Sequence, residues 1–360
     1  MEKLTMFDYI KETPDVLKYN IKYHEKLLEP LMKEYKDQLE VKRIILVASG
    51  SSHNACYCAR EFIRKCTGLE VKILTPYTFT YYEYEVNESD FVLVITQSGL
   101  STNAIEAIKV LNRLGHKSIC LTGNKNSDVK DVADVVIEYG VQEELVGYVT
   151  KGVTTLTLFL DLFAIEISQK YEYLEELKKA ANLNVEMIEK SIDFINVHYK
   201  NLSSMTCVYS CGAGSNYGTA LESALKIGET IHIPSFCYEV EEYIHGPNLQ
   251  LTPQYTVFFY DGNDGASHRV KQIYQATREI TDRCFMISNN SDYKDDAHVL
   301  MLSDGGCGEL APIVYLPFVQ LLSYVISKDT HKIYQHPLLK KFKEIASAKT
   351  ENFVNYDEDD

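Results

Sequence analysis

Short apolar runs alternate with amphipathic stretches along the first half of the chain. Five of these runs predict strands, at 43–49, 71–75, 90–96, 117–122 and 134–138. Apolar positions at helical spacing predict helices between them, at about 53–67 and 101–114, and a longer helix from Lys151 to Lys170. Strands that alternate with helices are typical of a parallel sheet with helices on both faces.

The second half repeats this alternation. Four apolar runs predict strands, at 205–211, 255–260, 283–288 and 298–302. Helical patterns stand before and between them, at about 184–198, 215–230, 266–281 and 311–326. The charged stretch Lys170–Lys179 is interpreted as the junction of the two halves, and Pro234–Tyr243 as an irregular acidic loop. An amphipathic helix is expected over 15–38, and the tail from His331 is polar and rich in lysine.

Two distant segments carry almost the same letters, NSDVKDVADVV at 126–136 and NSDYKDDAHVL at 290–300. This similarity between the halves indicates two copies of one α/β unit. We therefore expect an α/β fold with two tandem, doubly wound parallel-sheet domains, an N-terminal helix and a C-terminal tail. The predicted divisions are an N-terminal helical segment at 1–38, a first domain at 39–172, a second domain at 183–330 and a tail at 331–360.

Composition narrows the classes of function. The net charge is −15 and the pI is near 5.2, which argues against nucleic acid or an anionic membrane surface as a partner. No apolar run approaches the ~18 residues of a membrane span, so no span is expected, and the N-terminus does not have the pattern of a signal peptide. The nine cysteines include no CxxC pair, and no His/Cys spacing typical of a metal site is present. We expect a cytoplasmic protein without a metal or cofactor.

Hydroxyl side chains gather in two loops of the first copy. The strand at 43–49 ends in Ser49-Gly-Ser-Ser52, and the strand at 90–96 ends in Thr96-Gln-Ser-Gly-Leu-Ser-Thr102. A helix is predicted directly after each loop, so free N–H groups and hydroxyls should meet at helix N-termini, where phosphate binds. Ordinary N-capping is the alternative, but seven Ser/Thr residues exceed what two caps need.

The second copy provides an internal comparison for this interpretation. Its counterpart of Thr96-Gln-Ser-Gly99 is Gly262-Asn-Asp-Gly265, which has lost the hydroxyls and gained a carboxylate. A carboxylate would repel phosphate. The pattern therefore predicts phosphate binding by the first copy alone.

A second candidate site lies in the second copy. Glu222, Lys226 and Glu229 are spaced to share one face of a predicted helix, and His245 follows on a His-Gly-Pro turn. A solvated Glu–Lys pair is the simpler explanation of this spacing. A carboxylate base together with an imidazole could instead move protons on a sugar.

These motifs resemble those of the sugar isomerase (SIS) domain family over residues 40–330, most closely the isomerase half of glutamine–fructose-6-phosphate amidotransferase. The resemblance rests on five pieces in order, namely Ser49-Gly-Ser-Ser52, Thr96-Gln-Ser-Gly99, Glu144 with Thr150-Lys151, Leu221-Glu-Ser-Ala-Leu-Lys226 and His245-Gly-Pro247. The family implies a flavodoxin-like sheet in each domain. It also implies roles for particular residues.

By this resemblance, a phosphate cradle is formed by Ser51, Ser52, Thr96, Gln97, Ser98 and Ser101. Glu144 is expected to contact the sugar's hydroxyl or amino groups. Lys349 is the nearest match to a C-terminal lysine that enters the family's site. These three expectations define the predicted substrate-binding residues.

The resemblance also implies a proton-transfer apparatus. Glu229 is expected to shuttle a proton between C1 and C2, with Lys226 and Glu222 as its neighbours on the helix. His245 is expected to open the sugar ring in the site of the other subunit, so a homodimer would be the smallest active form.

The chain also departs from the amidotransferase pattern. It has no room for a glutaminase domain, and Leu100 and Ile244 replace a glutamate and a lysine of the family. The expected activity is therefore an isomerase or deaminase for a glucosamine-6-phosphate type of amino sugar. One alternative is a deglycase for a fructosamine-6-phosphate, such as a fructoselysine or glucoselysine type. A second alternative is a non-catalytic phosphosugar-binding regulator.

Overall fold

The computed structural model describes residues 4–38, 40–145, 147–303, 308–330 and 338–354. The chain divides into two compact units. The first unit is drawn from Asp15–Cys56, Phe62–Tyr173 and Gln335–Asp360, and the second from Met1–Pro14, Tyr57–Glu61 and Leu174–Tyr334. The predicted boundaries at 39–172 and 183–330 remain predictions, and residues 331–337 and 355–360 of the predicted tail lie outside the described residues.

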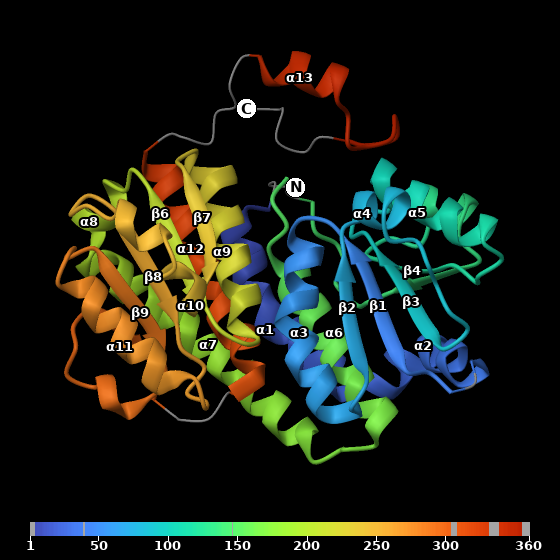
Figure 1. The fold of residues 1–360 in the computed structure, drawn as a ribbon, viewed down its shortest axis with the longest axis horizontal. Helices are drawn as coiled ribbons and strands as arrows, with labels where there is room; N and C mark the ends of the chain where they lie inside the picture. The colour runs from blue at the N-terminus through green and yellow to red at the C-terminus, as the bar shows by residue number, and fades with distance from the viewer. Residues whose placement is uncertain (1–3, 39, 146, 304–307, 331–337, 355–360) are drawn as a thin grey trace. The chain divides into compact units, whose positions relative to one another are not determined.

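A parallel five-stranded sheet forms the centre of the first unit (Figure 1). Its strands are β1 (Arg43–Ala48), β2 (Glu70–Leu74), β3 (Asp90–Ile95), β4 (Ile119–Thr122) and β5 (Val135–Glu138). The strand order is β2-β1-β3-β4-β5, the flavodoxin-like order. Its helices are α2 (His24–Asp37), α3 (Ser51–Thr67), α4 (Pro76–Tyr81), α5 (Thr102–Arg113), α6 (Lys151–Ser168), α13 (Leu339–Ile345) and the 3-10 turn η1 (Asp128–Asp131).

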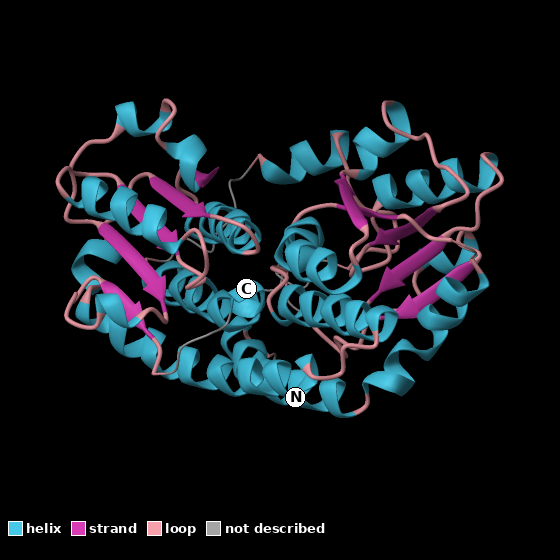
Figure 2. Ribbon diagram, turned by 60° about the horizontal axis from the view of Figure 1, so that its bottom comes forward, coloured by secondary structure: helices cyan, strands magenta, loops and turns pink. Residues whose placement is uncertain are grey.

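The second unit has a sheet of the same design (Figure 2). Its strands are β6 (Val208–Gly212), β7 (Ser235–Glu239), β8 (Thr256–Tyr260), β9 (Cys284–Ser288) and β10 (Val299–Met301). The order β10-β9-β8-β6-β7 is that of the first sheet when the strands are counted from β6. The predicted α/β fold with two doubly wound parallel sheets is therefore confirmed.

The remaining helices belong wholly or mainly to the second unit. They are α1 (Met6–Lys22), α7 (Tyr173–Val197), α8 (Tyr199–Ser203), α9 (Asn216–Ile231), α10 (Val240–Tyr243), α11 (Ser267–Arg278), α12 (Ala311–Asp329) and the 3-10 turns η2 (Pro247–Gln250), η3 (Ser291–Tyr293) and η4 (Gly308–Leu310).

Two local predictions were wrong, those for the acidic loop and for the N-terminal helix, and one agrees with the structure. The acidic segment after Pro234 is not irregular, because β7 pairs in parallel with β6 and α10 follows it. As an edge strand with mostly half-buried residues, β7 lacks the apolar signal that marks a central strand. The expected junction at Lys170–Lys179 agrees with the division of the chain between Tyr173 and Leu174, where α7 begins. The expected helix over 15–38 is two helices, α1 and α2, which meet at Tyr23.

The prediction that no apolar run approaches a membrane span also needs correction. The helical stretch Gly308–Asp329 is 22 residues long and has a mean hydropathy of 1.7, enough to cross a membrane by length and composition. However, 89% of this apolar window is buried inside the fold, which is typical of a core helix.

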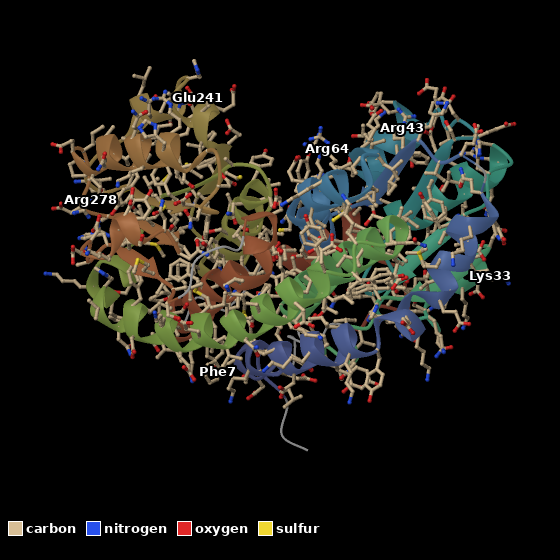
Figure 3. All side chains as sticks on the ribbon, turned by 90° about the horizontal axis from the view of Figure 1, so that it is seen from below. Phe7, Lys33, Arg43, Arg64, Glu241 and Arg278 are labelled. Atoms are coloured by element: carbon tan, nitrogen blue, oxygen red, sulfur yellow. The ribbon has the colours of Figure 1, made fainter. Side chains whose placement is uncertain are left out.

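Side chains fill the space around each sheet (Figure 3). At the amino ends of β1 and β3, Arg43, which is labelled in the figure, pairs with Asp90 at 2.6 Å (Nη2 to Oδ2). Above this ion pair the two strands run in register from Arg43↔Asp90 to Ala48↔Ile95. Their carboxyl ends are therefore held side by side, and the loops that follow them start from the same edge of the sheet.

Candidate functional site

The two hydroxyl-rich loops of the first unit lie at the switch point of its sheet. One follows β1 and the other follows the neighbouring strand β3, where ligands bind in open α/β sheets. Asn103 joins the loops, because its Nδ2 donates to Ser49 Oγ at 3.0 Å. Ser51 and Ser52 begin α3, and both are 7% exposed. The structure thus brings the predicted phosphate residues of both loops together.

The loop after β3 turns sharply before α5. Gly99 has φ +64°, and a Cβ placed there would lie 1.7 Å from Ser127 Oγ. Thr96 Oγ1 donates to Ser101 Oγ at 3.2 Å across this turn. Glycine is therefore required at position 99 both by conformation and by space, and the turn sets the hydroxyls of this loop at the start of α5.

Lys349 joins this cluster. The C-terminal residues form an isolated antiparallel bridge, Ser101↔Lys349, with the loop. The Lys349 Nζ lies 3.0 Å from Ser98 Oγ and 3.0 Å from Ser101 Oγ. Burial lowers the pKa of Lys349. The sequence suggested this lysine as a site residue only by resemblance, whereas the structure places it on the hydroxyls of the loop after β3.

Glu144 has a different environment from the one expected. Its carboxylate accepts from the backbone N–H groups of residues 150–152 at 2.6–3.0 Å, so it caps α6. It also accepts from Gln97 Nε2 at 2.5 Å, and Tyr139 donates to Gln97 Oε1 at 3.0 Å. Burial raises the pKa of Glu144, although these hydrogen bonds oppose the change. Glu144 therefore acts on the loop through Gln97, and its contact with a sugar remains a prediction.

In the second unit, the three spaced charges form a cluster on α9. Lys226 Nζ lies 2.6 Å from Glu229 Oε1 and 3.3 Å from Glu222 Oε1. The Lys226 and Glu222 side chains are 0% exposed, so the alternative of a solvated ion pair is wrong for them. Burial alone would lower the pKa of Lys226, but the carboxylates of Glu229 and Glu222 outweigh it and raise the pKa.

Glu229 is the accessible member of this cluster. Its side chain is 30% exposed, and one oxygen is held by Lys226. A Cβ added to the adjacent Gly228 would meet no atom within 4 Å, so there is open space beside this glycine on α9. This arrangement holds a carboxylate firmly while leaving it open to a reactant.

His245 is exposed on the turn that follows α10, with its backbone N–H donating to Glu242 O at 3.1 Å. Nearby on α10, Glu241 (labelled in Figure 3) pairs with Arg269 at 2.9 Å. Among the hydrogen bonds and ion pairs of the described residues, none joins His245 to Glu229. Its role in the site of another subunit remains a prediction.

Comparison with known proteins adds to this geometry. A family model described as the SIS domain matches residues 39–166. These residues belong to the SIS domain family. The matched range covers the first sheet, both phosphate loops and nearly all of α6.

The chain is homologous to the isomerase half of the glutamine–fructose-6-phosphate aminotransferases. It is 29% identical over 315 residues to the enzyme of Caldanaerobacter subterraneus, covering 82% of this chain and 50% of the relative. It is 24% identical over 310 residues to that of Clostridium perfringens, covering 83% and 50%. The chain therefore spans about half the length of the curated relatives that it matches.

Solved structures share the fold. The C-terminal domain of glucosamine–fructose-6-phosphate aminotransferase from Francisella tularensis has a TM-score of 0.81 and 23% identity, covering 92% of this chain and 97% of that one. Glucosamine-6-phosphate deaminase from Thermotoga maritima has a TM-score of 0.70 and 19% identity, covering 89% and 94%. At these identities the likeness shows the fold alone.

The switch point of the second unit differs from that of the first unit in the charges that its loop carries. Asp261 follows β8, is 1% exposed, and accepts from Ser267 Oγ at 2.5 Å and Ser288 Oγ at 2.9 Å. Asp264 accepts from the Ala266 N–H at 2.8 Å. Carboxylates of the chain itself thus take the loop's donors. The hydroxyl-rich loops of the first unit, residues 49–52 and 96–102, include no Asp or Glu, and the carboxylate that reaches them, Glu144, accepts from the Gln97 amide. This difference agrees with the internal comparison made from the sequence.

Sequence reasoning missed several residues that organise the site. Asn103 links the two loops, Tyr139 orients Gln97, and Asn352 donates from Nδ2 to Asp128 Oδ1 at 2.9 Å, which fastens the C-terminal segment. No local motif marks these three, because each contact joins residues that are at least 42 positions apart.

Proposed function

We propose that this chain is a phosphosugar isomerase or deaminase that acts on a 6-phosphorylated amino sugar of the glucosamine-6-phosphate type. The observation that carries the proposal is the pair of hydroxyl-rich loops at one switch point, whose residues 49–52 and 96–102 include no Asp or Glu and which have Lys349 beside them. The homology to aminotransferases that are named for fructose-6-phosphate supports this substrate class.

The first unit would hold the phosphate. Hydroxyls of Ser51, Ser52, Ser98 and Ser101 and the N-termini of α3 and α5 supply donors to phosphate oxygens. Thr96 supports Ser101, and Gln97 is held by Glu144 and Tyr139. Because the phosphate is remote from the reacting carbons, its binding would anchor the substrate without taking part in the chemistry.

The second unit would supply proton transfer. Lys226 fixes Oε1 of Glu229, and the partial exposure of the Glu229 side chain, 30%, leaves its carboxylate accessible to a substrate. Glu229 takes the C2 proton of the open-chain amino sugar and returns a proton to C1, which converts the amine into an imine at C2. Water then adds to the imine, the carbon–nitrogen bond breaks, and ammonia and a ketose phosphate leave. Glu222 balances the buried ammonium of Lys226.

Ring opening would be assigned to His245. An exposed imidazole on a constrained turn can pass a proton to the ring oxygen, and we propose that it does so in the site of a partner subunit within a homodimer. The proposed setting is the cytoplasm, with a small phosphosugar as the ligand. We propose no nucleic-acid or membrane partner for a chain with a net charge of −15, and no metal or organic cofactor for a simple proton transfer.

A deglycase is the alternative reaction. With a fructosamine-6-phosphate, the same carboxylate would move a proton from C1 to C2, and hydrolysis of the imine at C1 would release an amino acid. A non-catalytic phosphosugar-binding regulator would need only the phosphate loops. The charge cluster on α9 favours an enzyme over a regulator, because burying the charges of Lys226 and Glu222 is costly and phosphate binding does not require it.

Analysis of the reaction products distinguishes the proposed isomerase or deaminase from the two alternatives. The purified protein is incubated separately with glucosamine-6-phosphate and with a 6-phosphofructosyl amino acid, and ammonia, free amino acid and hexose phosphate are assayed. Ammonia from the first substrate supports the deaminase, whereas amino acid from the second alone supports the deglycase. The Glu229→Gln variant should lose turnover by about 100-fold or more and still bind phosphosugar. Unchanged turnover in this variant would remove Glu229 from the mechanism.

A further inference from the structure

The C-terminal residues 347–353, named here the strap, lie along the phosphate loop of the first unit. The Thr102 N–H donates to Ala348 O at 3.1 Å, and the Thr350 N–H donates to Leu100 O at 2.9 Å. Asn352 anchors the far end of the strap through its 2.9 Å hydrogen bond to Asp128. The strap is therefore attached by its backbone and by one side chain, independently of Lys349.

Lys349 projects from the strap as an ammonium without a carboxylate partner. Its Nζ donates to Ser98 Oγ and Ser101 Oγ, both at 3.0 Å, and lies 5.4 Å from the centre of the Phe353 ring. Among the described residues no Asp or Glu oxygen forms an ion pair with it. A half-buried lysine is costly unless an anion pairs with it, and within the described ranges no carboxylate of the chain does so.

The two serines that receive these hydrogen bonds have their lone pairs filled. Ser98 Oγ also accepts from the Leu100 N–H at 3.3 Å, and Ser101 Oγ also accepts from Thr96 Oγ1 at 3.2 Å. A hydroxyl has two lone pairs and one O–H. Each serine has therefore only its O–H left to offer, and can bind a ligand atom only by donating to it.

We propose that Lys349 makes Ser98 and Ser101 obligate donors and supplies the matching positive charge, so that this site selects an acceptor-only dianion, a phosphate ester, over a neutral sugar hydroxyl. A neutral hydroxyl can accept but leaves the ammonium uncompensated, whereas phosphate oxygens accept from both serines and from the ammonium. The inference deepens the proposed function, on which it rests for the class of ligand. It makes the strap part of the phosphate site.

Binding measurements on the full chain test this role without depending on turnover. Inorganic phosphate, glucosamine-6-phosphate and unphosphorylated glucosamine are titrated calorimetrically into wild type, Lys349→Met, Lys349→Arg and Asn352→Ala. We expect Lys349→Met to weaken binding of both phosphate ligands by about tenfold or more and Lys349→Arg to retain most of the affinity. Asn352→Ala, which removes an anchor but no charge, should have a smaller effect.

Several outcomes would overturn the inference. Phosphate affinity unchanged in a folded Lys349→Met variant would do so, as would an absence of phosphate binding by wild type. Loss of kcat with unchanged phosphate affinity, together with trapping of a sugar on wild type but not on Lys349→Met by borohydride, would assign the amine to covalent chemistry instead. Lys349-dependent phosphate binding by a protein that turns over neither substrate would sustain the inference while the proposed reaction fails.

Discussion

The Lys226 ammonium is the central charge of the cluster on α9 and sets the position of the Glu229 carboxylate. It is fully buried between two carboxylates and holds one oxygen of Glu229 at 2.6 Å. A buried ion pair adds little net stability, but removing one partner leaves a buried charge without compensation. The cluster is therefore better explained by the position it imposes on Glu229 than by a contribution to folding.

Removal of this ammonium should destabilise the protein. We expect Lys226→Met to lower the free energy of unfolding by about 3–5 kcal/mol, because the wholly buried Glu222 loses its cationic partner. Urea denaturation measures the change. The exposed pair Lys109–Glu106 is a matched control, and Lys109→Met should cost less than about 1 kcal/mol. Equal effects of the two substitutions would contradict the role given to burial, whereas adding Glu222→Gln to Lys226→Met should recover part of the loss.

Asp161 on α6 should make the stability of the protein depend on pH, and the direction of this dependence follows from its burial. Its side chain is buried, neither carboxylate oxygen has a hydrogen-bond partner, and burial raises its pKa well above the ordinary value. The folded state therefore keeps a proton that the unfolded state releases above about pH 4. Stability conferred by the neutral form is present below that pH and is lost as the pH rises toward the folded-state pKa.

Asp161→Leu should remove this dependence. We expect the variant to gain about 2 kcal/mol over wild type at pH 7 and clearly less at pH 4, because the cost of the buried carboxyl is largest where the unfolded state is ionised. Urea denaturation at the two pH values provides the comparison. A gain of the same size at both would show that Asp161 does not titrate between them.

At the scale of elements, the turn after β3 and the corresponding turn after β8 differ in how much space they leave for a side chain. A Cβ on Gly99 would lie 1.7 Å from Ser127 Oγ, whereas a Cβ on Gly265, its counterpart in the repeat, would meet nothing within 4 Å. The first turn is packed tightly against the segment after β4, and the second is open. The tight packing keeps the phosphate loop in one conformation.

Alanine substitution at these two glycines should separate the turns. We expect Gly99→Ala to lower the free energy of unfolding by about 2–4 kcal/mol, from a strained positive φ and from overpacking against Ser127. Gly265→Ala should change it by less than about 1 kcal/mol. Thermal melts of the two variants measure the difference, and phosphate titration shows whether the first also weakens binding. A Gly99→Ala protein as stable as Gly265→Ala would contradict the packing described here.

The elements that the sequence predicted best are those with a strong local signal. β1 and β3 are buried throughout or nearly so, and their apolar runs identified them within a residue. β7 was missed because the sheet supports it on one side only, through its parallel pairing with β6. The reason is physical, since an edge strand draws its stability from backbone pairing that leaves little trace in side-chain pattern.

At the scale of the whole molecule, the proposal that His245 serves a partner subunit predicts complementation. Glu229→Gln and His245→Ala should each be inactive alone. When they are unfolded together and refolded as a mixture, heterodimers contain one site with both groups intact, so about a quarter of the wild-type activity should return. Activity assays on the mixture, with sedimentation to establish the dimer, measure this. No recovery in a mixture that contains heterodimers would place His245 in the site of its own chain.

The sequence by itself determined the α/β class, the repeat, the two hydroxyl-rich loops and the spacing of the charges on α9. These features are local or periodic, because they depend on apolar alternation, on clustered hydroxyls and on residues one helical turn apart. Only the tertiary structure decided that Glu144 caps α6, that the second unit fills its own switch point with Asp261, and that Lys349 reaches Ser98 across 251 positions of chain. Such contacts depend on how distant segments pack, and packing is a property of the folded chain as a whole.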